Sequence, residues 1–132
     1  MAHYKKQCTA LRIPAVFHGF LERKQVFEIY KKAQFLMLPS TASEGFPKVI
    51  AEGMNFGCIP IVSAVSSIGQ YINQDNGFVV DPCTVAELKQ ILINLNLVAT
   101  ISLKNKARAS HKVAKDFTFE HYRYRIKSEI LL

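Results

Sequence analysis

The chain has 132 residues, enough for one domain with a hydrophobic core and too few for two. Hydrophobic residues make up 49% of it and charged residues 20%, as in an ordinary globular protein, and no apolar run approaches the roughly 20 residues of a membrane-spanning helix. The three cysteines are odd in number and far apart, which fits free thiols better than a disulfide framework or a zinc site, and no apolar leader is present, so we expect a cytoplasmic protein.

The formal net charge of +7 is concentrated near the C-terminus. Residues 104–127 contain eight basic residues and two acidic ones, Asp116 and Glu120, which gives this segment a charge of +6. One interpretation is a solvated helical face. The other is attraction to an anionic surface, either lipid headgroups at the inner face of a membrane or a polyanionic acceptor. No groove-reading motif accompanies this charge, so nucleic acid is not an expected partner.

The sequence pattern of the first part of the chain predicts a helix, a strand, a helix and a second strand. Residues 1–9 are polar and fit the remnant of a helix. The short apolar segment Ala15–Phe17 predicts a buried strand that ends at Gly19. Residues Glu22–Ala33 have the apolar spacing of an amphipathic helix. Residues Phe35–Leu38 form a continuous apolar run, as expected of a central parallel strand.

The middle of the chain predicts a helix between two strands and then a third strand. Residues Lys48–Asn55 predict a short helix, and Gly57 fits the left-handed residue that often follows a helix. Residues Ile59–Ser63 predict the next strand. Residues 74–77 read Gln-Asp-Asn-Gly, which predicts a turn, and Phe78–Val80 predicts a short strand after it.

The C-terminal part predicts helices. Thr84 and Glu87 have the spacing of a capping box that opens a helix to about Leu97, and Ser102–Asp116 and Thr118–Leu132 predict two more helices. Strands that alternate with helices predict a Rossmann-like α/β fold, a parallel sheet with flanking helices and right-handed crossovers. We expect one domain over residues 1–132 with a helical C-terminal segment from about residue 101.

The most informative stretch is residues 44–52, which reads Glu-Gly-Phe-Pro-Lys-Val-Ile-Ala-Glu. It follows an apolar strand and a Pro-Ser turn, so the helix should start at the carboxyl end of a strand, where ligands bind on parallel sheets. Pro47 suits the first helical position, and the free N–H groups of a helix N-terminus attract anions. Glu44 and Glu52 would flank this anion site. Such an arrangement suits a ligand with both hydroxyls and phosphate, such as a nucleotide sugar.

This stretch resembles the Glu-x7-Glu motif of retaining GT-B glycosyltransferases, the glycosyl transferases group 1 family. Other blocks resemble the family's motifs in the family's order: Val16–Gly19, Phe35–Ser40, Gly57–Ser63 and Asn76–Pro82. The resemblance covers roughly residues 10–125. It implies that the chain is part of the GT-B C-terminal domain, which binds the sugar donor.

The resemblance assigns roles to particular residues. Glu52 would bind the ribose hydroxyls of the nucleotide, and Glu44 would act as the catalytic-site residue that accepts hydrogen bonds from the donor sugar. The residues predicted to approach the sugar are Gly45, Phe46 and Pro47. The residues predicted to contact the base through their backbone are Gly19, Phe20 and Leu21. Where the family often has a Gly-Gly-Ile loop near the diphosphate, this chain has Ser66, Ser67 and Ile68, whose hydroxyls can bind phosphate although the backbone approaches less closely.

Structural alternatives exist for the same residues. Glu52 could be an ordinary, partly exposed helix glutamate, and Glu44 a carboxylate that caps the positive end of a helix. Gly45 could be a turn glycine, and Phe46 a core residue. These alternatives remain open at the level of sequence.

The implied parent enzyme transfers a hexosyl unit from a nucleotide-diphosphate sugar to a glycan or lipid-linked acceptor with retention of configuration, in polysaccharide biosynthesis. No cofactor and no metal are implied, and the chain has no Asp-x-Asp motif. The family's Gly-Arg and lysine pattern, which neutralises the leaving diphosphate, belongs upstream of Val16 and is not found in the fifteen residues before it. We therefore expect an N-terminally truncated domain that is inactive alone.

Two alternative functions and one further expectation remain. The chain could be a non-catalytic nucleotide-binding or interaction module, or a basic module that docks on an anionic membrane. Without the family's earlier strands a sheet edge would be exposed, so self-association through that edge is also expected.

Overall fold

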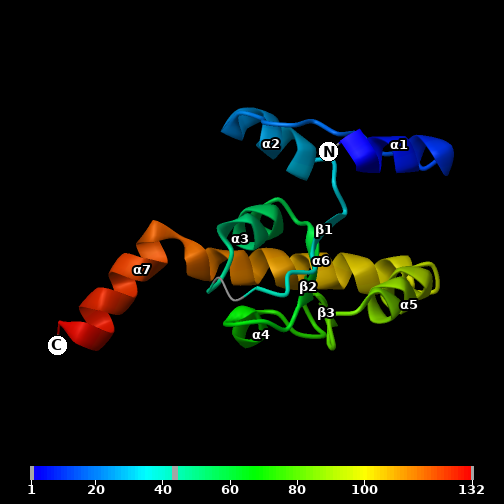
Figure 1. The fold of residues 1–132 in the computed structure, drawn as a ribbon. Coiled ribbons are helices and arrows are strands. Elements are labelled where there is room, and N and C mark those ends of the chain that lie inside the picture. The colour runs from blue at the N-terminus through cyan, green and yellow to red at the C-terminus, as the bar shows by residue number, and fades with distance from the viewer. Residues whose placement is uncertain (1, 43–44, 132) are drawn as a thin grey trace.

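The computed structural model describes residues 2–42 and 45–131 of the chain (Figure 1). The helices are α1 (Ala2–Ala10), α2 (Arg23–Tyr30), α3 (Lys48–Asn55), α4 (Ile68–Tyr71), α5 (Val85–Leu95), α6 (Thr100–Ala114) and α7 (Phe119–Arg125). The strands are β1 (Phe35–Leu38), β2 (Ile59–Ser63) and β3 (Phe78–Val80). A single 3₁₀ turn, Lys115–Phe117, connects α6 to α7, and a π-helical turn, Ile126–Ile130, follows α7.

The strands form a parallel sheet in the order β1-β2-β3. Phe35 of β1 lies opposite Ile59 of β2, and Ile61 of β2 lies opposite Phe78 of β3. Each strand is joined to the next through a helix, so the carboxyl ends of the strands share one edge of the sheet. The predicted Rossmann-like fold and the bounds of all the strands within this sheet are confirmed.

The hydrophobic core lies between the sheet and the helices that cross it. All five residues of β2 are buried, as expected for the central strand of a parallel sheet. The core cluster gathers buried side chains from several elements: Ile50, Met54, Val62, Ile68, Ile72 and Ala114. This packing fixes α3, the helix that carries Glu52, against the sheet.

Helix α6 runs past α3 and β2 and makes hydrogen bonds to segments that flank the strands (Figure 1). The buried hydroxyl of Ser110 donates a hydrogen bond of 2.9 Å to the carbonyl of Cys58, just before β2. The ring Nδ1 of His111 lies 2.9 Å from the carbonyl of Asn55, at the end of α3. The ammonium group of Lys106 donates to the carbonyls of Gln74 and Gly77, in the turn before β3.

Several predicted helix ends are confirmed. Helix α3 spans the predicted residues, and Gly57 after it has φ +84°. The hydroxyl of Thr84 accepts a hydrogen bond of 3.2 Å from the Glu87 N–H at the start of α5. Thr118 caps α7 in the same way, with the His121 N–H as donor. Thr84 and Thr118 lie just before their helices, and each side chain accepts a hydrogen bond from an N–H group that the helix itself leaves unpaired.

Pro47 is one position off its prediction. The structure places it at the N-cap of α3, with φ −65° and ψ 124°, rather than at the first helical residue. Its carbonyl accepts a hydrogen bond of 3.0 Å from Ile50. The extended ψ explains the difference, because a helical residue needs a negative ψ near −40°.

The predicted strand Ala15–Phe17 is wrong. Residues 13–19 have no regular secondary structure, and 77% of the surface of Val16 is exposed. A strand exists only through hydrogen bonds to a neighbour, and within the described residues the sheet contains only β1, β2 and β3. The segment is apolar, but among the described residues it pairs with no strand and therefore forms none.

Two other helical details differ from the predictions. Helix α4 was not predicted, since four residues are too few to show a helical period. The predicted helix Thr118–Leu132 changes from α to π geometry after Arg125. In the part of the chain that the structure describes, no helix is long and apolar enough to cross a bilayer.

Candidate functional site

The loop after β1 starts from a fixed point at the carboxyl edge of the sheet. The hydroxyl of Ser63, the last residue of β2, is buried and donates a hydrogen bond to the carbonyl of Ser40. The hydroxyl of Ser40 in turn accepts a hydrogen bond of 3.3 Å from the Ala42 N–H. The ends of β1 and β2 are thus joined where the predicted donor-binding motif begins.

We call residues Gly45–Pro47 the donor loop. Gly45 is exposed and has φ +67°, a conformation that favours glycine. The ring of Phe46 is partly buried and packs against the hydrophobic core. It stacks on the ring of Phe117 with centroids 4.2 Å apart and meets the ring of Tyr71 at 5.1 Å. The side chain of Phe46 therefore has the packing role that the sequence left open, and a contact to a sugar could come only from its backbone.

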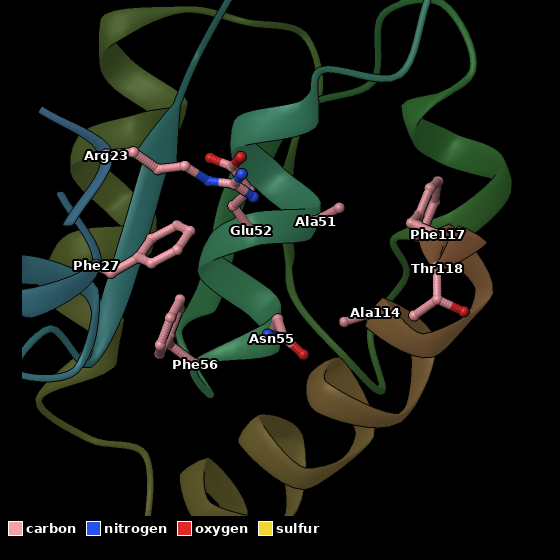
Figure 2. Close-up of a pocket in the computed structure, with 9 residues that line it drawn as sticks. All are labelled: Arg23, Phe27, Ala51, Glu52, Asn55, Phe56, Ala114, Phe117 and Thr118. Carbon is pink, nitrogen blue, oxygen red and sulfur yellow. The ribbon is translucent and has the colours of Figure 1, made fainter. Parts of the chain in front are cut away.

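Glu52 lines a cavity of about 290 Å³ between α2, α3 and the C-terminal end of α6 (Figure 2). The cavity is lined by residues of all three regions: Arg23, Phe27, Ala51, Glu52, Asn55, Phe56, Ala114, Phe117 and Thr118. Glu52 is half-buried, and the side chain of Arg23 extends toward it (Figure 2). The cavity therefore combines a carboxylate, a cation and aromatic walls.

The aromatic wall is continuous from α2 to the end of α3. The guanidinium of Arg23 lies 5.0 Å from the centroid of the Phe27 ring, a cation–π contact. The Phe27 ring lies 5.0 Å from the Phe56 ring, which stacks on Tyr30 at 5.9 Å. Burial raises the pKa of Tyr30, and the negative charge of Glu52 adds to this rise. The Glu52 carboxylate thus acts electrostatically on Tyr30, behind the Phe56 ring.

Gly53 sets the distance between Glu52's helix and the sheet. A Cβ at Gly53 would lie 3.0 Å from the Cδ2 of Leu36 and 3.4 Å from its Cβ. The missing side chain lets α3 approach β1 closely, and Glu52 is the residue just before Gly53 in the sequence. The position of Glu52 thus depends on a close helix–strand contact.

The predicted base loop, Gly19–Leu21, lies just before α2 in the chain, and its own residues do not line the cavity. Gly19 has φ +71°, Phe20 is 96% exposed, and Leu21 is partly buried. Helix α2 starts two residues later with a capping box between Glu22 and Gln25. Arg23, in the first turn of this helix, lines the same cavity as Glu52. The fold therefore brings the start of α2 and the middle of α3 together, 29 residues apart in the chain.

The Ser66–Ile68 segment contains one residue with a left-handed backbone. Ser66 has φ +55°, in the left-handed region that glycine adopts most easily. Ser67 is the N-cap of α4, and Ile68 is buried in the core. Glu44 lies outside the described residues, so its predicted role stays a prediction.

Arg23 and Phe117 line the cavity but were not found from the sequence. Arg23 opens an ordinary amphipathic helix, and Phe117 follows a long basic helix, so neither carries a local signal. Among the described residues, no three His, Cys, Asp or Glu side chains are placed to hold a metal ion. That the transfer reaction needs no metal ion stays a prediction, which comes from the resemblance to the family.

Solved structures of two proteins share the fold of this chain. Sucrose-phosphate synthase from Thermosynechococcus elongatus matches with a TM-score of 0.77 and 19% identity over 96% of this chain. HepE from Anabaena, in complex with UDP and glucose, matches with a TM-score of 0.79 and 22% identity over 98%. HepE in complex with UDP matches with a TM-score of 0.81 and 23% identity over 98%. At these identities the likeness shows the fold alone, and it confirms the predicted GT-B type.

The chain spans only 32% of the sucrose-phosphate synthase chain and 36% of the HepE chain. No curated protein sequence matched the chain. The family glycosyl transferases group 1 matches residues 2–108, which is most of the chain. The chain therefore belongs to the glycosyl transferases group 1 family.

Proposed function

We propose that this chain is the donor-binding part of a retaining glycosyltransferase that uses a nucleotide-diphosphate sugar. The observation that carries this proposal is the cavity in which Glu52 faces the start of α2. A half-buried carboxylate can accept hydrogen bonds from both hydroxyls of a ribose, and such charge-assisted bonds are strong. The adjoining Gly19–Leu21 segment offers backbone groups to the base.

The sugar end of the donor lies toward the donor loop in this proposal. Gly45 and Phe46 offer N–H groups near the N-terminus of α3, where the helix dipole favours the diphosphate. Glu44 accepts hydrogen bonds from the hydroxyls of the sugar. The bond between the anomeric carbon and the diphosphate oxygen breaks while the acceptor oxygen bonds to the same face of the sugar. The leaving diphosphate takes the acceptor proton, so no cofactor or metal takes part.

We further propose that the 132 residues alone do not transfer sugar. The negative charge that develops on the leaving diphosphate must be stabilised by preorganised donors, and losing one such donor costs about 3 kcal/mol. The chain lacks the Gly-Arg and lysine pattern that supplies these cations in the family. The sugar, the glycan or lipid-linked acceptor and a role in polysaccharide biosynthesis belong to the parent protein.

UDP is the first nucleotide to test, because the HepE structures contain UDP. The chain is titrated by calorimetry with UDP, GDP and ADP, and then with the isosteric variant Glu52→Gln. Because a hydrogen bond to a charged group contributes about 1.5–3 kcal/mol, the variant is expected to bind roughly 10- to 100-fold more weakly. Glu87→Gln is the matched control, since Glu87 is an exposed helix glutamate that does not line the cavity.

Two results would contradict the proposal. One is the failure of every nucleotide to bind. The other is equal affinity of wild type and Glu52→Gln, since the ribose would then lie elsewhere. Saturable binding of a single nucleotide, weakened by Glu52→Gln and unchanged by Glu87→Gln, is the expected result.

Docking on an anionic membrane is a second candidate function, favoured by α7. This helix leads away from the sheet (Figure 1) and exposes three aromatic side chains, Phe119, Tyr122 and Tyr124. The exposed Arg123 lies between Tyr122 and Tyr124 in the sequence, and the exposed Lys127 lies in the π-helical turn after α7. Aromatic and basic side chains together suit the interface of an anionic bilayer.

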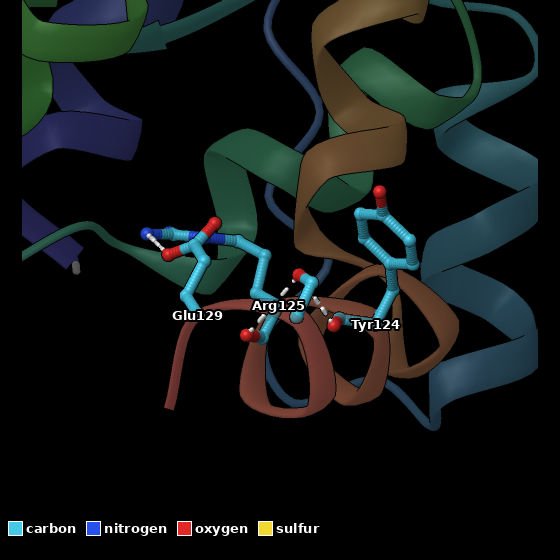
Figure 3. A network of polar contacts seen from close by, with 4 residues as sticks. Tyr124, Arg125 and Glu129 are labelled. Carbon is cyan, nitrogen blue, oxygen red and sulfur yellow. Dashed lines mark hydrogen bonds and ion pairs between the residues drawn. The ribbon is translucent and has the colours of Figure 1, made fainter. Parts of the chain in front are cut away.

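The charge of α7 is smaller than its basic residues suggest. The guanidinium of Arg125 pairs with the carboxylate of Glu129 at 2.9 Å, next to the hydrogen bond from the Ser128 hydroxyl to the Tyr124 carbonyl (Figure 3). Co-sedimentation with vesicles, with and without phosphatidylserine, tests this candidate. Salt-sensitive binding to phosphatidylserine that persists in Glu52→Gln would support it, and equal binding to both vesicles would reject it.

A further inference from the structure

Three aromatic rings from three separate elements meet beside the donor loop. Phe46 belongs to the donor loop, Tyr71 ends α4, and Phe117 lies in the turn after α6. The Phe46 and Phe117 rings are stacked, with centroids 4.2 Å apart and an angle of 15° between their planes. Tyr71 meets Phe46 edge-on at 5.1 Å and Phe117 at 4.8 Å. Each ring of this aromatic cluster therefore touches the other two.

Phe117 also lines the cavity that contains Glu52 (Figure 2). It therefore contacts the donor loop on one side and borders the Glu52 cavity on the other. Its own position is well supported, because Ala114, one turn earlier, is buried in the core. The neighbouring Ser110 and His111 are hydrogen-bonded to the backbone around the end of α3.

The donor loop has few other constraints. Among the described residues, apart from the chain neighbours of Gly45, no atom lies within 4 Å of a Cβ built on it. A glycine in open surroundings is free to take many conformations, and ordering it on ligand binding costs free energy. The stacked ring of Phe46 holds the neighbouring residue in place before any ligand arrives.

We propose that Phe117 is a positioning residue for the donor site. Its ring holds Phe46, and through it the backbone of Gly45, in the conformation that receives the nucleotide sugar. The C-terminal part of the chain thus sets the affinity of a loop about 70 residues earlier in the sequence. This inference rests on the proposed function, since it assumes that the donor loop contacts the donor.

The test compares Phe117→Ala, Phe117→Leu and Phe117→Tyr in the whole chain. Phe117→Tyr keeps a ring of the same shape, while Phe117→Leu keeps apolar volume without a stacking face. Phe119→Ala is the matched control, because Phe119 is two residues away and 79% exposed, and its ring faces Tyr122 at 6.5 Å. Thermal unfolding identifies any variant that does not fold.

Two readouts are measured on each variant. The first is the ¹H–¹⁵N signal of the Gly45 amide without ligand, which reports the conformation of the donor loop directly. The second is the affinity for UDP by calorimetry. Loss of one aromatic pair predicts a roughly 3- to 10-fold weaker affinity in Phe117→Ala and Phe117→Leu. In both variants the Gly45 signal should shift or broaden, and Phe117→Tyr and Phe119→Ala should resemble wild type.

The proposal is overturned if Phe117→Leu leaves the Gly45 signal and the UDP affinity at wild-type values. It is also overturned if Phe119→Ala changes both as much as Phe117→Leu does, because the effect would then be general. If Phe117→Ala does not fold, the comparison of Phe117→Leu with Phe117→Tyr decides whether the ring positions the loop. If wild type binds none of UDP, GDP and ADP, the proposed function fails, and the Gly45 signal still shows whether Phe117 positions the loop.

Discussion

Ser66 has a backbone conformation that its own side chain disfavours. Its φ of +55° lies in the left-handed region, where the Cβ of an L-residue crowds the following carbonyl oxygen. The residue is exposed and lies just before α4, at the carboxyl end of β2. A glycine at this position would avoid this crowding, because it has no Cβ.

We predict that Ser66→Gly stabilises the chain by roughly 0.5–1 kcal/mol. The glycine relieves the strain of the left-handed backbone, and the greater entropy of the unfolded glycine offsets part of that gain. Ser67→Gly is the control, because Ser67 has φ −82° and gains nothing from the change. Urea unfolding of both variants measures the difference in free energy of unfolding. A Ser66→Gly variant less stable than wild type would show that the serine side chain has a stabilising contact.

Gly77 and Gly69 are a matched pair for testing how tightly the core is packed. A Cβ at Gly77 would lie 2.5 Å from the Cγ2 of Ile72 and 3.0 Å from the carbonyl oxygen of Pro60. At Gly69, in α4, nothing lies within 4 Å. We predict that Gly77→Ala destabilises by about 1–3 kcal/mol because the backbone of β2 must move. Gly69→Ala should be neutral or stabilising by up to about 1 kcal/mol. Thermal unfolding of both variants checks this contrast, and equal melting temperatures would contradict it.

At the scale of elements, α6 holds together segments that are far apart in the chain. Its contacts reach the end of α3, the start of β2 and the turn before β3, so three segments far apart in the chain depend on one helix. The helix also ends at the 3₁₀ turn that carries Phe117. The position of the candidate site thus depends on a C-terminal helix that the predicted motifs did not include.

We predict that Ser110→Ala destabilises the chain by about 1–2 kcal/mol, because the buried carbonyl of Cys58 loses its donor. Ser102→Ala on the same helix is the control, since Ser102 is exposed and alanine is the better helix former. The control should be equal to wild type or slightly more stable in urea unfolding. If both variants lose the same stability, the loss would come from the helix in general rather than from this hydrogen bond.

The same elements show which parts of the fold the sequence could reveal. The bounds of α3, β1, β2 and β3 were predicted because apolar runs and caps are local signals. The strand Ala15–Phe17 was wrong because pairing with a partner cannot be read from one segment. In the cavity, Glu52 was found through its spacing from Glu44, whereas Arg23 and Phe117 come from elements joined only by packing. Local chemistry was therefore predictable, and the side chains that packing brings to the cavity were not.

On the scale of the whole molecule, the described residues give the sheet two outer strands, β1 and β3. In the sheet of described residues, β1 is an outer strand that pairs only with β2. Its side chains are all apolar, and Met37 is 43% exposed. An apolar outer strand offers unpaired N–H and C=O groups to another chain. The expected self-association through this edge is therefore a testable property of the whole chain.

We predict concentration-dependent self-association that Met37→Lys weakens, because a charge on an edge strand opposes pairing with a second copy. Val85→Lys is the matched control, since Val85 is 84% exposed and lies on α5, outside the sheet. Both variants add one positive charge, so a general effect of repulsion changes them equally. Sedimentation velocity over a range of concentrations should show a shift toward monomer in Met37→Lys alone. A wild type that stays monomeric at every concentration, or an equal shift in both variants, would mean that β1 is not the associating edge.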